Sequence, residues 1–141
     1  MFLGTYTPKL DEKGRFFLPA KFREELTAEF VITRQPDRCL AVWPKEAFVA
    51  QVRETAPGPS VSPKNRAFKR MIASGASDES ADAQGRVVIP QPLRNYAGLT
   101  KDIYVIGADD HVEVWDAAQW ETYSAAQEEV FAHFGEDMDD D

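Results

Sequence analysis

The stretch LDEKGRFFLPAKFRE at residues 10–24 returns as ADAQGRVVIPQPLRN at residues 81–95. Every identical pair lies 71 positions apart, and between these pairs the apolar residues 16–18 align with 87–89 and Phe22 aligns with Leu93. The identical pairs are Asp11/Asp82, Gly14/Gly85, Arg15/Arg86, Pro19/Pro90 and Arg23/Arg94. Further along, the register shifts by one and Trp43 aligns with Trp115. A repeat at constant spacing indicates a duplicated structural unit, so it decides the architecture before any other feature.

Local chemistry predicts one plan for both copies. In the first copy, residues 5–10 read as a strand and residues 11–14 as a turn with Asp first and Gly fourth. Residues 15–18 read as a returning strand, so we expect the two strands to pair as a hairpin. Pro19 then begins a short helix, because its missing N–H is not needed in the first turn.

The remainder of each copy extends this plan. Phe22 and Leu26 fall four positions apart, on one face of the short helix. Two more strands and a further helix complete a unit that reads as ββαββ followed by a helix. In the first copy, we expect strands at 30–34 and 39–43 and then a helix from Pro44. In the second copy, we expect a turn at 83–85, a strand at 86–89, a short helix from Pro90 and strands at 103–106 and 112–115.

The repeats also predict the domain organisation. The expected division is 5–47 for repeat 1, 76–119 for repeat 2, 48–75 for linker helices and 120–141 for a C-terminal helix and acidic tail. Within the linker, residues 56–60 are rich in helix breakers. Ser62, Pro63 and Gly75 supply the start and end signals of a helix. Residues 135–141 are too acidic to pack, and we expect them to be disordered.

The fold class follows from the size of one unit. A unit of about 45 residues is near the lower limit for burying a core alone, and its open strand edges would pair with whatever is available. Two copies in one chain solve both problems by closing on each other. We therefore expect a mainly β protein with short helices (α+β), in which the duplicated units close into one β-barrel with pseudo-twofold symmetry and two equivalent turns.

The composition narrows the classes of protein to which the chain can belong. The chain has 141 residues with 43% apolar and 28% charged side chains, which is ordinary for a globular protein. No apolar run approaches the roughly 20 residues of a membrane span, and the opening residues show no basic leader before a long apolar stretch. The single Cys39 is expected to pack inside a strand and fits a reducing cytoplasm.

The charge is divided unevenly along the chain. The formal net charge is −8, which by itself argues against nucleic acid as a partner. Residues 1–76, however, hold 13 Lys and Arg against 8 Asp and Glu, whereas residues 77–141 hold 3 against 16. A basic half beside an acidic tail is typical of nucleic-acid contact. Acidic residues that only solvate a C-terminal helix would produce the same asymmetry.

The turns carry the candidate binding residues. Lys13, Arg15 and Arg86 place cations at or beside the two tips, and a two-stranded ribbon fits the major groove, where Arg reads O6 and N7 of guanine. Lys13 suits a phosphate. The alternative is that Asp11 and Asp82 merely pair with the arginines across each turn. Such a surface pair contributes only about 0–1 kcal/mol, and it does not explain why the whole pattern occurs twice.

Other residues are weaker candidates. Lys9 lies beside the first turn and could reach a phosphate, and Arg23 and Arg94 lie in the short helices, where a solvated face is the alternative. The basic face of the linker helix at 62–75 is better explained as a solvated surface. His111 lies near acidic residues, but a polar loop explains it better than a metal or base site. The chain contains no known catalytic motif, so we expect no enzyme, cofactor or metal.

The quoted residues resemble a known family. D-E-K-G-R-F-F-L-P-A-K-F-R and D-A-Q-G-R-V-V-I-P-Q-P-L-R resemble the AbrB-like swapped-hairpin DNA-binding fold, and their tandem occurrence after the opening M-F-L-G resembles the bacterial MraZ family. The resemblance implies a DNA-binding transcriptional regulator, usually a repressor, at the promoter of the cell-division and cell-wall gene cluster. It also implies nucleoid association and a ring-like homo-oligomer that binds short direct repeats of double-stranded DNA.

The resemblance assigns roles to individual positions. The D-x-K-G-R element falls on Asp11, Lys13, Gly14 and Arg15, and again on Asp82, Gly85 and Arg86, with Gln84 in place of the lysine. The complete candidate set is Lys9, Lys13, Gly14, Arg15, Arg23, Arg86 and Arg94 for DNA, with Asp11, Asp82 and Gly85 shaping the turns.

Two other classes remain open. An antitoxin shares the swapped-hairpin motif but usually has one copy followed by a disordered tail that binds a partner, and here the second copy takes that place. A protein-binding scaffold would instead use the acidic tail and the aromatic helices.

Overall fold

The computed structural model describes residues 1–26, 28–55 and 62–136. The elements in chain order are β1 (Thr5–Tyr6), β2 (Arg15–Phe17), α1 (Ala20–Glu25), β3 (Phe30–Gln35), a 3-10 turn (Pro36–Arg38), β4 (Cys39–Pro44), α2 (Lys45–Thr55), α3 (Pro63–Ser74), β5 (Ser77–Glu79), β6 (Arg86–Val88), α4 (Gln91–Ala97), β7 (Ile103–Gly107), β8 (Val112–Asp116) and α5 (Ala117–Ala132). The prediction of a mainly β protein with short helices is confirmed. The breaker-rich residues 56–60 and the end of the acidic tail lie outside the described ranges.

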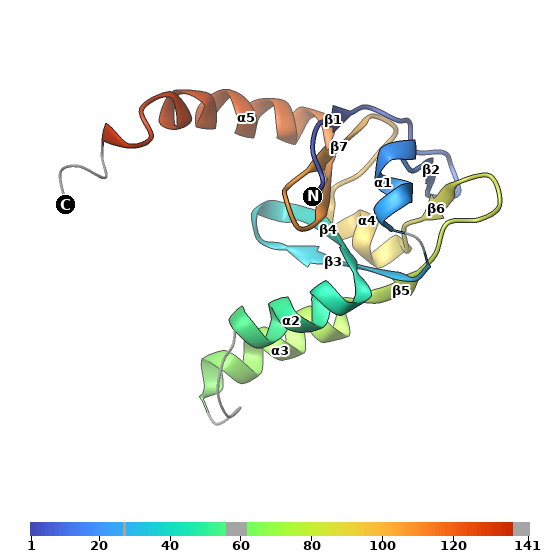
Figure 1. Cartoon of the computed structure of the whole chain (residues 1–141), viewed down its shortest axis with the longest axis horizontal. Coiled ribbons are helices and arrows are strands. Elements are labelled where there is room, and N and C mark those ends of the chain that lie inside the picture. Colours follow the sequence, from blue (N-terminus) through green and yellow to red (C-terminus); the bar gives the residue numbers. More distant parts are fainter. Residues whose placement is uncertain (27, 56–61, 137–141) are drawn as a thin grey trace.

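The strands form one antiparallel sheet and a separate two-stranded ribbon. The sheet has the order β1-β7-β8-β4-β3-β5, and β2 pairs with β6 in the ribbon. The two repeats meet at the centre of the sheet, where β4 pairs with β8 through Leu40 and Val114. Each repeat also lends its first strand to the other, because β1 pairs with β7 and β5 pairs with β3. The repeats are therefore exchanged and not merely placed side by side (Figure 1).

The predicted pairing of each strand with its own return strand is wrong. The two turns do close locally, but β2 pairs with β6 of the other repeat, with Phe16 opposite Val87. The strand expected at 5–10 is a regular strand only over Thr5–Tyr6. The chain then runs along the second repeat, where the Leu10 N–H donates to the Lys101 carbonyl at 2.9 Å. The exchanged pairing buries Phe16 and Val87 to 1% exposure each, which favours it over a free hairpin.

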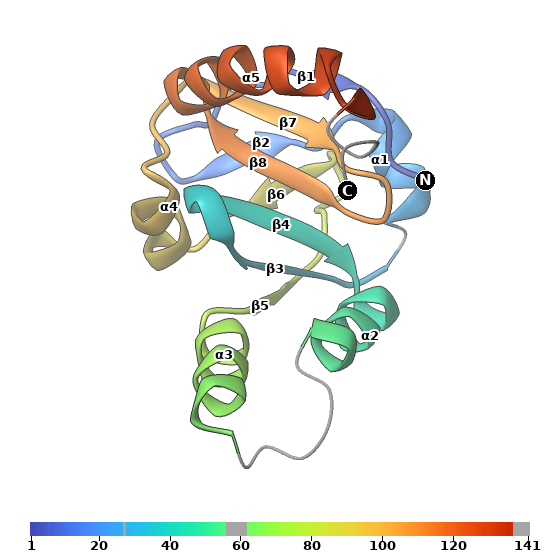
Figure 2. The ribbon, with the colours of Figure 1, turned by 90° about the vertical axis from the view of Figure 1, so that its left-hand side faces the viewer.

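The predicted closed barrel is not confirmed. The larger sheet ends in the edge strands β1 and β5, and the β2–β6 ribbon is not hydrogen-bonded into it. Figure 2 shows the ribbon as a second layer behind the sheet. The short lengths of β1 and β5 limit the unpaired edge that remains.

One apolar core lies between these layers and under the short helices. Phe22 of α1 and Leu93 of α4 point into it from equivalent positions of the two repeats. Phe22 packs edge-on against Phe2 and Tyr6, with ring centroids 5.7 and 5.2 Å apart. Leu26 is buried as well, so the predicted apolar face of the first short helix is confirmed.

The longer helices leave the body in two directions. Figures 1 and 2 show α2 and α3 on one side of the sheet and α5 on the other. Ser62 caps α3 as predicted, since its hydroxyl accepts from the Asn65 N–H at 3.5 Å. Asp116 caps α5 by accepting from the Gln119 N–H at 3.1 Å. The C-terminal helix therefore begins before residue 120, the expected start.

Candidate nucleic-acid interface

The two turns have nearly identical backbone geometry. The Asp11 N–H donates to the Arg15 carbonyl at 2.8 Å, and the Gly14 N–H donates to the Asp11 carbonyl at 3.0 Å. In the second repeat, both corresponding bonds are 2.9 Å long. Gly14 and Gly85 adopt φ values of 80° and 85°, a left-handed conformation that favours glycine. The glycines therefore permit a tight turn at each end of the ribbon.

The Asp11 carboxylate organises the first turn. One carboxylate oxygen accepts from the Lys13 and Arg15 backbone N–H groups at 2.9 and 2.8 Å. The other oxygen accepts from Arg15 Nε at 2.8 Å. The hydrogen bond from the Arg15 backbone is the main cause that lowers the pKa of Asp11. Burial acts in the opposite direction, and the hydrogen bonds from the Arg15 side chain and the Lys13 backbone lower the pKa further. The carboxylate is thus ionised at neutral pH and locks both the turn and the arginine.

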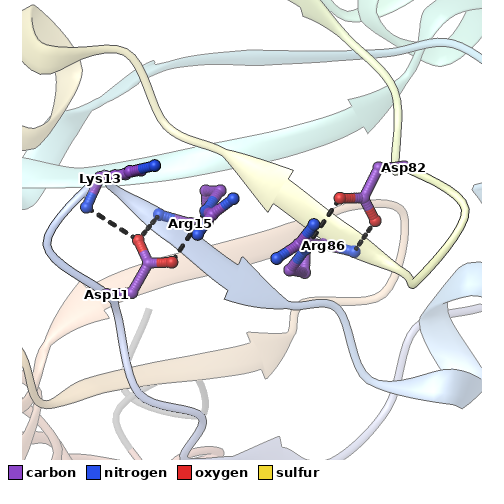
Figure 3. Close-up of polar contacts among 5 residues, drawn as sticks. All are labelled: Asp11, Lys13, Arg15, Asp82 and Arg86. Carbon is purple, nitrogen blue, oxygen red and sulfur yellow. Dashed lines mark hydrogen bonds and ion pairs between the residues drawn. The ribbon is translucent and has the colours of Figure 1, made fainter.

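Asp82 performs the same task in the second turn. It accepts from the backbone N–H groups of Gln84 and Arg86 and from Arg86 Nε at 2.8–2.9 Å. The Arg86 backbone hydrogen bond is the main cause that lowers the pKa of Asp82. Figure 3 shows the two Asp–Arg pairs at opposite ends of the ribbon, with both arginines over its middle.

The ion pairs do not fully occupy the arginines. Each pair uses Nε, and both arginine side chains remain 29% exposed. Within the described ranges, the terminal guanidinium nitrogens of Arg15 and Arg86 donate no further hydrogen bond. The pairing across each turn that we considered as an alternative is therefore real. It orients the guanidinium groups and leaves their terminal donors available.

The ribbon has one buried and one outward face. Phe16 and Val87 form the central pair and point into the core. Since successive side chains alternate between faces, Arg15 and Arg86 lie on the outer face together with Phe17 and Val88. Phe17 is 59% exposed and Val88 44%. Sequence reasoning did not select these two apolar residues, although alternation about a buried Phe16 was the signal that could have found them.

Arg23 and Arg94 reach across to the turn of the other repeat. A Cβ placed on Gly14 would overlap the guanidinium of Arg94, and a Cβ placed on Gly85 would overlap that of Arg23. Arg94 is partly buried, and its Nε has no hydrogen-bond partner among the described residues. The solvated helix face that we considered as the alternative does not describe Arg94. Both arginines, which were predicted as DNA contacts, lie against the turn of the other repeat.

The remaining cations differ in their surroundings. Lys9 forms an ion pair with Asp102, and the hydrogen bond from Lys9 lowers the pKa of Asp102. Its ammonium group is therefore directed to the neighbouring repeat. Lys13 is exposed at the first tip, while the equivalent Gln84 leaves the second tip without a charge.

His111 belongs to the polar loop between β7 and β8. Its ring accepts or donates bonds with Asp110 and Glu113 at 2.8 and 2.9 Å and stacks on Trp43 with centroids 4.4 Å apart. Burial lowers the pKa of His111, but the hydrogen bonds with Glu113 and Asp110 outweigh it and raise the pKa overall. Among residues 1–26, 28–55 and 62–136, no group of three metal-binding side chains is present.

None of the helices in the described part of the chain combines the length and the apolarity that crossing a membrane requires.

Two exchanged copies of one unit, joined through a ribbon with a matched pair of arginines, define a tandem swapped-hairpin protein. A family model described as "MraZ protein, putative antitoxin-like" matches residues 1–71 and again residues 72–141. The chain therefore belongs to the MraZ family, and the resemblance predicted from its motifs is confirmed.

Individual relatives agree over almost the full length. A protein of Cutibacterium acnes is 63% identical over 132 residues, covering 94% of this chain and 93% of the relative. Proteins of Corynebacterium efficiens and Micrococcus luteus are each 51% identical over 138 residues, covering 98% of this chain and 96% of the relative. All three are named "Transcriptional regulator MraZ". The family is thus one of transcriptional regulators.

Proposed function

We propose that this chain is a sequence-specific transcriptional regulator that binds double-stranded DNA through the outer face of the β2–β6 ribbon. The observation that carries the proposal is the placement of Arg15 and Arg86 on that face, with their terminal nitrogens available. A two-stranded ribbon fits the width of the major groove. The spacing of the arginines is held by the ladder between the strands and by one aspartate for each arginine.

The chemistry of the face supports base reading. An arginine can donate two hydrogen bonds to O6 and N7 of a guanine, and apolar side chains contact the methyl group of thymine. Phe17 and Val88 lie beside the arginines and can supply that apolar contact. Lys13 at the first tip suits a phosphate, which positions the ribbon without reading sequence. Gln84 makes the second tip the weaker phosphate contact.

One ribbon offers few contacts, so affinity requires several ribbons. A homo-oligomer that places ribbons on successive direct repeats raises the effective concentration of each contact. The family resemblance supports such an assembly in the form of a ring. It also supports repression at the promoter of the cell-division and cell-wall gene cluster, with the protein in the cytoplasm at the nucleoid. Regulation would follow from occupying the promoter, without bond chemistry.

The charge distribution is consistent with this orientation. Figure 1 shows the ribbon and α5 at opposite sides of the molecule. Helix α5 and its glutamates are therefore carried away from the proposed DNA face, where they would otherwise repel phosphates.

Titration of the promoter upstream of the chain's own gene tests the proposal. Arg15→Ala should lower the affinity for this DNA severely while circular dichroism and assembly stay unchanged. Arg53→Ala removes the same charge from an exposed position of α2 and serves as the matched control. Equal affinity of Arg15→Ala and the wild type at the same salt concentration would overturn the assignment.

A further inference from the structure

The distal end of α5 presents apolar side chains to solvent. Val130, Phe131 and Phe134 are 58%, 79% and 73% exposed. The base of the helix, in contrast, is anchored by Trp120 and Tyr123, which pack against Trp115. The helix thus projects from the body with an aromatic end that nothing in the described residues covers (Figure 1). An exposed cluster of this kind is typical of an interaction site.

An apolar groove made of two adjoining hollows lies along α3. One hollow of about 160 Å³ is lined by residues that include Phe48, Val52, Phe68 and Ile72. A second hollow of about 190 Å³ shares Phe68 and Ile72 and extends to Met71. It lies between α3 and residues 34–36 with Tyr96 of α4, and it has no α2 residue in its lining. A cavity of about 150 Å³ is large enough to hold benzene. Each hollow is therefore large enough for one phenylalanine ring.

The two surfaces carry opposite charges. Helix α3 has four basic side chains and no acidic one: Lys64, Arg66, Lys69 and Arg70. Residues 117–136 have four glutamates and neither Lys nor Arg: Glu121, Glu128, Glu129 and Glu136. Two α5 helices would repel each other, whereas α5 and α3 attract. The charges therefore favour a contact between unlike surfaces.

The two surfaces of one chain cannot meet each other. In both views the sheet lies between α5 and the α2–α3 pair (Figures 1 and 2). We propose that the distal end of α5 of one copy docks into the groove along α3 of a second copy, with Phe131 and Phe134 in its two hollows. Such a head-to-tail contact generates a ring when its rotation closes. The ribbon lies at the opposite side of the molecule from both surfaces and stays free.

This inference rests on the homo-oligomer of the proposed function and assigns its interface. Assembly is measured without DNA, so that a failure of the interface is distinguishable from a failure of DNA reading. The tail variant is Phe131→Ser with Phe134→Ser, and the groove variant is Arg70→Glu with Met71→Glu. All four side chains are exposed, so folding should be preserved and is checked by thermal unfolding. Leu3→Ser, at another exposed apolar side chain, is the matched control.

Sedimentation velocity measures the outcome. The wild type and Leu3→Ser should form the same closed oligomer, while the tail and groove variants should each be monomeric. An equimolar mixture of the two variants retains one intact pair of surfaces and should form a 1:1 dimer and nothing larger. A monomeric wild type, a groove variant that still assembles, or a mixture that stays monomeric would each overturn the proposal.

DNA binding to a single repeat provides the separate readout. Both variants should bind one repeat as the wild type does and lose affinity only for several repeats in series. A groove variant that assembles normally but fails on one repeat would overturn the docking proposal and place α3 on the DNA.

Discussion

Replacement of Gly14 by alanine tests how the exchanged repeats support the turn. Gly14 has φ of 80°, and a left-handed L-residue costs about 1–2 kcal/mol. The new Cβ would also overlap the Arg94 guanidinium, and pushing a side chain off its rotamer costs about 0.5–1.5 kcal/mol. Gly14→Ala should therefore lower the free energy of unfolding by about 1.5–3.5 kcal/mol.

Urea unfolding followed by tryptophan fluorescence measures this loss. Gly135→Ala is the control, because Gly135 also has positive φ but, apart from its chain neighbours, no atom of the described residues within 4 Å of its Cβ position. In an Arg94→Ala background, Gly14→Ala should retain only the backbone part of the effect, about 1–2 kcal/mol. Equal stability of Gly14→Ala and the wild type would refute the reasoning. An unchanged effect in the Arg94→Ala background would show that the contact between the repeats contributes nothing.

Two further predictions concern charge. Hydrogen bonds in the folded state lower the pKa values of Asp11 and Asp82. Their ionised carboxylates therefore stabilise the folded state fully above the unfolded pKa of about 3.9, and this stabilisation is lost as the pH falls through the lower pKa of the folded state. Between pH 6 and 3, the free energy of unfolding measured in urea should fall more steeply for the wild type than for the double variant Asp11→Asn with Asp82→Asn. Parallel pH curves of the two proteins would contradict the role of the carboxylates. Lys13→Gln should reduce the slope of log affinity against log salt concentration by about one, and Gln84→Lys should increase it by about one. Unchanged slopes in a fluorescence anisotropy titration would show that neither turn tip contacts a phosphate.

The duplication and the local elements could be predicted from the sequence. The five identities at constant spacing showed two equivalent units, and Asp, Gly and Pro signals placed the turns and helix starts within a few residues. These signals are local, because they depend on backbone preferences of single residues and on short hydrogen bonds such as those of Asp11.

The exchange between repeats could not be predicted. Residues 15–17 have the same local preference whether they pair with the preceding strand or with β6, and only burial of Phe16 against Val87 decides between them. The same limit applies to the site. The turns were predicted, but the position of Arg94 against Gly14 and the outward placement of Phe17 depend on the exchanged pairing. The open sheet follows for the same reason, since β2 and β6 pair only with each other.

Removal of a single acceptor atom from the DNA tests the central claim most directly. Each guanine of the promoter repeat is replaced in turn by 7-deazaguanine, which lacks N7, and affinity is measured for the wild type and for Arg15→Ala. At one guanine the wild type should lose about 1–3 kcal/mol of binding free energy, while Arg15→Ala should be insensitive to the same replacement. Equal losses in both proteins, or no loss at any guanine in the wild type, would contradict base reading by the ribbon.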